Sequence, residues 1–162
     1  MVKVNRKEAE PMKEGYVDNR FASLYYKEMG QGMPLIMLHG NGESHEIFAR
    51  LSELMSRYYR VILMDSRGHG SSLMKEEAAG GDLTIPDMAA DVVQVMEFLH
   101  VPRAVILGFS DGANVALETA SCYPGRVSAV VAVSGNALPR GMSAASLMEV
   151  KIKYALWRGL EK

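Results

Sequence analysis

Short apolar runs alternate with amphipathic segments along most of the chain, and this alternation limits the possible folds more than any other feature of the sequence. Four apolar runs have the length and composition of buried strands, at residues 34–39, 60–65, 104–109 and 127–133. Segments with helical spacing lie between them. Strands that alternate with helices predict an α/β fold, with a mostly parallel sheet flanked by helices.

Each predicted helix has one apolar face. The first helix covers about residues 45–58, with the apolar positions Ile47, Phe48, Leu51, Leu54, Met55 and Tyr58. The second covers residues 85–99 and begins after Thr84, a candidate N-cap. Its predicted solvent-facing side consists of Asp87, Asp91, Gln94 and Glu97. The third helix ends before Pro124, and its predicted buried positions are Ala113, Ala116, Leu117 and Ala120.

The two ends of the chain depart from this pattern. Residues 1–14 are a polar arm, and strand-like stretches at residues 16–17 and 22–28 flank the turn signal Asp18-Asn19, which predicts a hairpin-like start. We expect the core domain to span residues 15–136. From residue 137 a loop precedes a further predicted helix, which runs to residue 162 with Ser143 as a possible N-cap.

Composition excludes several classes of protein. A length of 162 residues corresponds to one compact domain. The net charge is −1 and the sequence contains no run of five like charges, so we expect neither a nucleic-acid partner nor a basic membrane-surface helix. The longest apolar runs are too short to span a bilayer, and the first residues are charged where a signal peptide is apolar. We therefore expect a cytoplasmic protein without a membrane partner. The single Cys122 cannot form an intrachain disulfide, and we predict that it is a small buried residue.

The sequence Gly108-Phe109-Ser110-Asp111-Gly112 lies between a predicted strand and a predicted helix and fits the pattern G-x-S-x-G. A strand that turns directly into a helix forces the middle residue into a strained backbone conformation, and flanking glycines remove the side chains that would clash there. We expect Ser110 to stand exposed at the carboxyl edge of the sheet. The backbone N–H of Asp111 would lie at a helix N-terminus, where it can stabilise an oxyanion.

A second motif, His39-Gly40-Asn41-Gly42, directly follows the first buried strand. Together with residues 65–72 (DSRGHGSS) and the serine motif, it occurs in the order and spacing of the α/β-hydrolase superfamily, which the chain resembles over about residues 15–136. The resemblance implies that Ser110 is the nucleophile and that the N–H groups of Asn41 and Asp111 form the oxyanion hole. It also implies that His39, Gly40, Gly108 and Gly112 support the two motifs, and that Asp65 and Arg67 brace their loop.

Within the superfamily, a serine at this position resembles the branch that forms acyl-enzymes, whereas the dehalogenase-like and epoxide-hydrolase-like branches use an aspartate. The implied substrate is a small molecule with an ester, a thioester or a related acyl bond, and no cofactor or metal is expected. The bond type follows from this resemblance, and the substrate itself stays open.

The acid and the histidine of a triad follow the nucleophile in this superfamily, and neither is in this sequence. All four histidines precede Ser110, and Asp111 is the only aspartate after it. The chain is thus similar to the N-terminal portion of a hydrolase, and residues 137–162 correspond to the start of a helical lid region. Two hypotheses remain: the nucleophile-bearing part of a serine hydrolase, or a non-catalytic remnant or binding module that retains the fold.

His45 and His69 lie on loops at the same predicted sheet edge as Ser110 and could replace the absent base, but no carboxylate in the sequence is evidently placed to orient either ring.

The last predicted strand bears on self-association. The apolar run 127–133 contains no Lys or Pro and would form an open edge, so we expect a homo-oligomer that forms through this strand or through the terminal helix.

Overall fold

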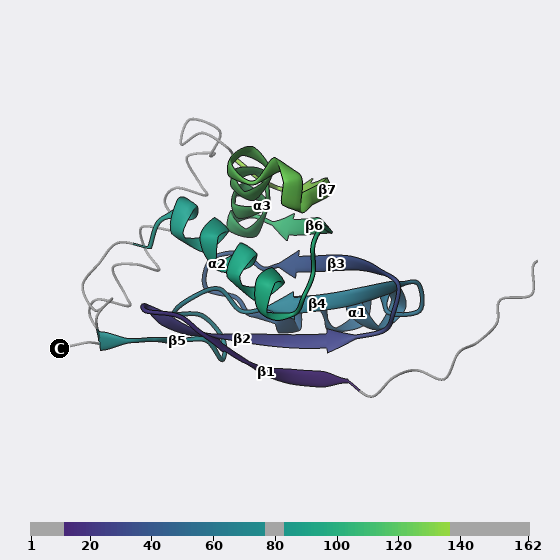
Figure 1. The fold of residues 1–162 in the computed structure, drawn as a ribbon, viewed down its shortest axis with the longest axis horizontal. Helices are drawn as coiled ribbons and strands as arrows, with labels where there is room; N and C mark the ends of the chain where they lie inside the picture. Colours follow the sequence, from purple (N-terminus) through teal and green to yellow (C-terminus); the bar gives the residue numbers. More distant parts are fainter. Residues whose placement is uncertain (1–11, 77–82, 137–162) are drawn as a thin grey trace, which may run out of the picture.

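The computed structural model describes residues 12–76 and 83–136, and its described strands form one sheet (Figure 1). The strands are β1 (Lys13–Asp18), β2 (Ala22–Met29), β3 (Met33–Leu38), β4 (Tyr59–Met64), β5 (Leu73–Met74), β6 (Ala104–Phe109) and β7 (Val127–Val133). Their order is β1-β2-β4-β3-β6-β7, with β5 paired to β2. The pairs β3–β4, β3–β6 and β6–β7 are parallel, and the pairs that contain β2 are antiparallel. The predicted α/β fold with a mostly parallel sheet is confirmed.

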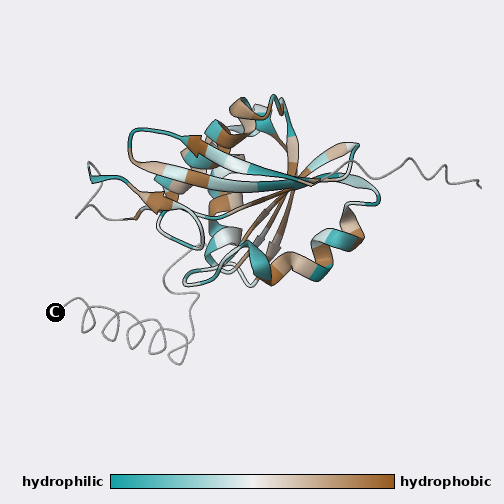
Figure 2. Cartoon of the chain, turned by 90° about the horizontal axis from the view of Figure 1, so that it is seen from below, coloured by the Kyte–Doolittle hydropathy of each residue, from teal (hydrophilic) through white to brown (hydrophobic). Residues whose placement is uncertain are grey.

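The helices lie on both sides of this sheet (Figure 2). They are α1 (Ala49–Met55), α2 (Ile85–Phe98) and α3 (Asp111–Cys122), with the short 3₁₀ turns η1 (His45–Phe48) and η3 (Pro124–Arg126). The central strands β3 and β4 carry apolar residues on both faces, and Figure 2 shows this hydrophobic centre in brown. Such strands need cover on both sides, which is why their sequences show no polar alternation.

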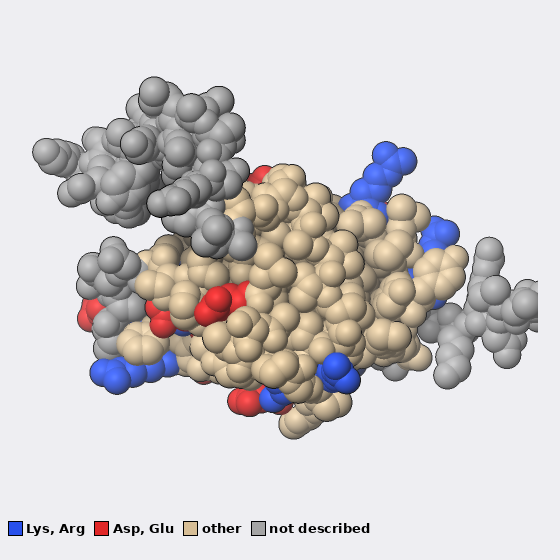
Figure 3. Space-filling view, turned by 90° about the horizontal axis from the view of Figure 1, so that it is seen from above, with Lys and Arg blue, Asp and Glu red and all other residues tan. Residues whose placement is uncertain are grey.

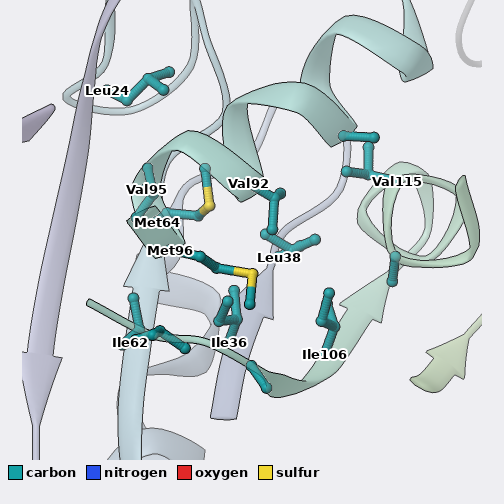
Figure 4. Packing of buried hydrophobic residues seen from close by; sticks show 14 of the residues in the cluster. Leu24, Ile36, Leu38, Ile62, Met64, Val92, Val95, Met96, Ile106 and Val115 are labelled. Atoms are coloured by element: carbon teal, nitrogen blue, oxygen red, sulfur yellow. The ribbon is translucent and has the colours of Figure 1, made fainter. Parts of the chain in front are cut away.

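Alternate residues of β3 point into two separate cores. Ile36 and Leu38 pack on the side of α2 and α3, where Val92 and Met96 of α2 meet them (Figure 4). Leu35 and Met37 pack on the other side against Phe48. Because the side-chain period of a strand is two residues, a register shift of one residue would exchange the two sets, so both cores fix the register of β3.

The start of the domain is the predicted hairpin. The side chain of Asn19 accepts hydrogen bonds from the backbone N–H groups of Phe21 (2.8 Å) and Ala22 (2.7 Å), which closes the turn between β1 and β2. Strand β1 begins at Lys13, two residues before the predicted start of the core at residue 15. Residues 1–11 of the predicted arm and the predicted helix within 137–162 lie outside the described residues.

Helix α2 begins as predicted, because the side chain of Thr84 accepts a hydrogen bond from the backbone N–H of Asp87 at 3.2 Å. The prediction that Asp91 faces solvent is wrong, since only 1% of this residue is exposed. Its carboxylate accepts two hydrogen bonds from Arg67, each 2.6 Å long, and a third from Asn19. A charge can be buried on this face because a bidentate partner from a distant loop neutralises it.

Burial along α1 and α3 also differs from prediction. The first predicted helix divides into η1 and the short α1. Within residues 45–58, Phe48 and Ser52 are buried, and His45, Met55 and Ser56 are half-buried. Four of the predicted apolar positions are exposed: Ile47, Leu51, Leu54 and Tyr58. On α3, Leu117 and Cys122 are exposed, so both predictions of burial were wrong. On this face of the sheet, Phe48 of η1 and Met55 of α1 pack on β3 and β4, whereas Ile47, Leu51 and Leu54 stay exposed.

Strand β7 pairs only with β6 among the described residues. Val131 is 45% exposed although it lies within a strand, and the molecule seen from this side is largely free of charged side chains at its centre (Figure 3). The described part of the chain therefore contains an apolar edge strand. Within residues 12–76 and 83–136 no helix is both long and apolar enough to cross a membrane, and the cytoplasmic location stays a prediction.

Candidate active site

Ser110 occupies the single residue between β6 and α3, with φ 53° and ψ −119°. A positive φ is costly for a residue with a side chain, so the surrounding structure has to hold this conformation. The backbone N–H of Ser110 donates to the carbonyl of Val133 at 2.9 Å, and its own carbonyl accepts from Ala113 at 2.9 Å. The side chain makes no capping hydrogen bond to α3. The backbone is thus fixed from both sides, while the hydroxyl takes no part in the helix cap.

The two flanking glycines are required by close backbone approach. A Cβ on Gly108 would lie 2.1 Å from the carbonyl oxygen of Gly112, and a Cβ on Gly112 would lie 2.1 Å from the carbonyl oxygen of Leu38. Real Cβ contacts are essentially never shorter than 3.0 Å. The first turn of α3 therefore packs directly on β3 and β6, as the motif predicts.

His39 shapes the loop after β3. Its Nε2 accepts a hydrogen bond from the backbone N–H of Ser66 at 3.0 Å, so Nδ1 carries the proton and donates to the carbonyl of Gly40 at 2.7 Å. Burial lowers the pKa of His39, which keeps the ring neutral. With both nitrogens in use, His39 has no free nitrogen to act as a base.

Gly40 brings this loop against Ser110. The point where a Cβ of Gly40 would lie is 3.0 Å from Cβ of Ser110 and 2.7 Å from Oε2 of Glu43. The same carboxylate oxygen accepts a hydrogen bond from the backbone N–H of Gly40 at 2.9 Å. Glu43 thus holds the turn from three residues downstream, and Gly40 leaves no room for a side chain between Glu43 and Ser110.

The structure also brings Asn41 and Asp111 to one place. Both line a small cavity of about 20 Å³, together with His39, Gly40, Ser66, His69, Met88, Gly112 and Val115. A cavity of this volume is large enough for one water molecule. The side chain of Asn41 is tied to the neighbouring loop, because its Oδ1 is 3.0 Å from Nε2 of His69, whose Nδ1 is 3.1 Å from the carbonyl of Arg67. The predicted oxyanion residues therefore meet at the carboxyl edge of the sheet, next to the turn that carries Ser110.

The loop at residues 65–72 is braced as the sequence predicts. The fully buried Asp65 accepts hydrogen bonds from the backbone N–H groups of His45 (2.6 Å) and Ser71 (2.8 Å). A Cβ on Gly70, which has φ 53°, would lie 2.2 Å from Oδ2 of Asp65. Arg67 ties the loop to α2 through Asp91. Each of these contacts fixes the loop that carries His69.

The prediction that no carboxylate orients His45 is wrong. Nδ1 of His45 lies 3.0 Å from Oδ1 of Asp65, and its ring packs on Tyr25 of β2 at a centroid distance of 5.1 Å. Strand β2 lies on the far side of β4 from β3 and β6. The ring of His45 therefore contacts the β2 side of the sheet edge, whereas His69 is the histidine that contacts the Asn41 loop.

Sequence reasoning missed Glu43 and the partner of His45. Glu43 had a local signal, because an acidic residue three positions after a glycine turn can reach back to the turn's N–H, as in a capping box. The Asp65–His45 contact joins residues 20 positions apart and has no such signal. No group of three or more His, Cys, Asp or Glu side chains within residues 12–76 and 83–136 could hold a metal ion.

The fold and this edge define an α/β hydrolase, and comparison with known proteins assigns the family. The family model for the alpha/beta hydrolase fold matches residues 33–160. This chain belongs to the alpha/beta hydrolase fold family. The resemblance inferred from three sequence motifs is thereby confirmed.

Individual relatives have the same amino acid as this chain at about one aligned position in three. The AB hydrolase superfamily protein YisY of Bacillus subtilis is 34% identical over 104 residues, which are 64% of this chain and 37% of that protein. The pimeloyl-(acyl-carrier protein) methyl ester esterase of Chromobacterium violaceum is 31% identical over 113 residues, or 69% of this chain and 41% of the esterase.

Among solved structures, Est816, described as an N-acyl homoserine lactone degrading enzyme, superposes with a TM-score of 0.72. It is 32% identical, and the match covers 80% of this chain and 49% of Est816. This chain therefore spans less than half the length of each of these three proteins.

Proposed function

We propose that this chain is the nucleophile-bearing part of a serine hydrolase that cleaves an ester or a related acyl bond. The observation that carries the proposal is the strained turn at Ser110, which Gly108 and Gly112 allow by close backbone packing. Strain of this kind persists only where the surrounding structure maintains it, and it is concentrated at functional sites. The esterase and the lactone-degrading enzyme among the relatives support an ester-type bond.

In the proposed reaction, Oγ of Ser110 attacks the carbonyl carbon of the acyl group and loses its proton to a base. The carbonyl oxygen becomes an oxyanion, and the backbone N–H groups of Asn41 and Asp111 stabilise it. Collapse of the intermediate expels the alcohol and leaves an acyl group on Ser110, which water then removes. Helix α3, whose first residue is Asp111, adds the positive end of its dipole at the oxyanion.

Covalent labelling tests the role of Ser110. The chain is incubated with a fluorophosphonate, whose phosphorus forms a bond to an attacking serine oxygen while fluoride leaves. Intact-mass and peptide mass spectrometry then locate the adduct. We expect Ser110 to be labelled faster than any other serine, and Ser110→Ala to lose that adduct. Equal labelling of several surface serines would contradict the assignment.

The chain by itself is expected to turn over activated esters very slowly, because all four histidines precede Ser110 and, among the described residues, none is hydrogen-bonded to its hydroxyl. Oxyanion stabilisation alone leaves about 10³- to 10⁴-fold catalysis over water in serine proteases. The measurement is p-nitrophenyl acetate hydrolysis by the chain beside Ser110→Ala. A fast rate that depends on Ser110 would contradict this expectation and make His69 the first candidate base.

A non-catalytic binding module is the second candidate. The observation that favours it is that three histidines at this sheet edge already have partners: His39 binds Ser66 and Gly40, His45 binds Asp65, and His69 contacts Asn41. For a binding module, fluorophosphonate labelling of Ser110 would be no faster than labelling of exposed serines, so the same experiment separates the two candidates.

We also propose that the chain self-associates through β7. The strand is an apolar edge without Lys or Pro, and Val131 and Val133 are both exposed, so a second copy could pair with it across a two-fold axis. Light scattering over a dilution series should give twice the chain mass of 17.8 kDa at the higher concentrations. Val131→Lys should shift the species toward monomer, because a charge on an edge strand opposes pairing. A monomer of both proteins at all concentrations would contradict the proposal.

A further inference from the structure

The ring of His69 connects the two loops that follow β3 and β4. Its Nε2 lies 3.0 Å from Oδ1 of Asn41 in the loop after β3, and its Nδ1 lies 3.1 Å from the carbonyl oxygen of Arg67 in the loop after β4. Within residues 12–76 and 83–136 the Asn41 side chain makes no other hydrogen bond. Both ring nitrogens are therefore engaged, and His69 is the link between the two loops.

His69 itself belongs to a firmly held loop. Its backbone N–H donates to the carbonyl of Ser66 at 2.9 Å, and its carbonyl accepts from the N–H of Ser72 at 2.9 Å. The Arg67 side chain is buried and makes two hydrogen bonds of 2.6 Å to Asp91 of α2. The carbonyl that contacts Nδ1 thus belongs to a residue anchored on a helix, and the ring has a fixed base.

Asn41 has fewer contacts within its own loop. It is exposed, and it lies in a turn that is closed by a hydrogen bond of 3.3 Å from the N–H of Glu43 to the carbonyl of Gly40. Gly42 in the same turn has no heavy atom within 4 Å of the point where a Cβ would lie. The N–H of Asn41 has no acceptor among the described residues. The contact with His69 therefore supplies the restraint that this turn lacks.

We propose that His69 is a positioning residue of the oxyanion hole, which directs the backbone N–H of Asn41 by holding the Asn41 side chain. The proposal rests on the proposed function, because it assumes that this N–H stabilises an oxyanion at Ser110. His69, Asn41 and Asp111 line the same small cavity, so the ring lies beside both predicted oxyanion residues. An oxyanion donor is effective when the folded protein already points it at the place where charge develops.

The same contacts distinguish this role from that of a general base. A base needs a free lone pair within hydrogen-bond reach of the Ser110 hydroxyl, and Nε2 of His69 faces Asn41 instead. The Asn41 amide can serve either form of the ring, since it accepts through Oδ1 when Nε2 is protonated and donates through Nδ2 when it is not. Removal of the Asn41 side chain would free Nε2. Asn41→Ala should therefore weaken a positioning role, whereas it would not weaken a base.

The rate at which a fluorophosphonate labels Ser110 tests the proposal, because the phosphoryl oxygen gains negative charge during the attack. His69→Ala and Asn41→Ala each remove the contact and keep the backbone N–H at position 41. Loss of a whole oxyanion donor costs about 10²- to 10³-fold in rate in subtilisin, and here the donor is kept but less well directed, so we expect each variant to label Ser110 about five- to twentyfold more slowly.

Three further variants separate positioning from a general loss of structure. Because the two single variants break the same contact, the double variant should be no more than about twofold slower than either one. His69→Gln, whose amide nitrogen can donate to Oδ1 of Asn41, should stay within about threefold of the parent rate. His100→Ala, at an exposed residue before the amino end of β6, is the matched control and should label at the parent rate. The amide spectrum of each variant reports whether its fold is intact.

Two kinds of outcome would overturn the proposal, and they are distinguishable. If His69→Ala or Asn41→Ala labels as fast as the parent, or if their effects multiply in the double variant, the positioning role is refuted and the proposed function remains. If Ser110 of the parent chain is labelled no faster than exposed serines, the proposed function itself is refuted, and the positioning role falls with it.

Discussion

A single methyl group at Gly112 should destabilise the whole domain. In Gly112→Ala the new Cβ would lie 2.1 Å from the carbonyl oxygen of Leu38 and 2.6 Å from that of His39, whereas ordinary contact begins at 3.4 Å. Both obstacles are backbone atoms and cannot rotate away. Helix α3 would have to move from β3 by about 1 Å in a densely packed interior. Overpacking typically costs 1–3 kcal/mol, and because the strained atoms here are backbone we expect about 3 kcal/mol or more.

Urea unfolding followed by circular dichroism measures this cost. With a slope of about 1–3 kcal/mol/M for a small domain, a loss of 3 kcal/mol lowers the midpoint by about 1–3 M. Gly108→Ala should behave similarly, because its Cβ would lie 2.1 Å from the carbonyl oxygen of Gly112.

Gly125→Ala is the matched control for both variants. No heavy atom lies within 4 Å of its added Cβ, and its φ is not positive. Its stability should therefore stay within about 0.5 kcal/mol of the parent chain. If Gly112→Ala lost no more stability than Gly125→Ala, the close packing of α3 on β3 would not constrain the Ser110 turn, and the argument from strain would fail.

Two further predictions concern buried charge. Arg67→Met should lower the free energy of unfolding by about 3–5 kcal/mol, because the Asp91 carboxylate stays buried with Asn19 as its remaining partner. Adding Asp91→Leu should recover part of that loss in the same urea assay. A double variant no more stable than Arg67→Met would contradict this. Burial lowers the pKa of His39, so the unfolded chain takes up a proton at a higher pH than the folded chain does. The urea concentration at the midpoint should therefore decrease as the pH is lowered below about 6.5. His39→Gln should reduce this decrease and His100→Gln should not, and an equal pH dependence in the parent chain and both variants would refute the assignment.

The sequence predicts the sheet well because its strands carry their own signal. The runs at 34–39, 60–65, 104–109 and 127–133 are apolar except for His39, Arg60, Asp65 and Ser128, and each corresponds to a strand with ends displaced by no more than one residue. The role of Gly108 and Gly112 is also predictable from the sequence, since the strand-turn-helix geometry requires glycine at both places.

The features that the sequence does not predict depend on contacts between distant residues. Asp91 has the position of a solvent-facing residue on α2, and only the loop 24 residues earlier supplies the Arg67 that buries it. On α1, apolar residues that were predicted to be buried are exposed. Helical periodicity identifies an apolar face but does not tell whether a neighbouring element covers it. The Asp65–His45 contact likewise depends on how two loops fold over the ends of β3 and β4.

The Ser110 turn is completed by two contacts that a growing polypeptide forms at different times. The packing of Gly112 on the carbonyl of Leu38 needs only β3 and the first turn of α3, whereas the acceptor for the Ser110 N–H is Val133, at the end of β7. Chains emerge from the ribosome N-terminus first at about 5–20 residues per second. The residues for the glycine packing are thus synthesised about a second or more before Val133, and the turn reaches its final geometry only when Val133 joins the sheet.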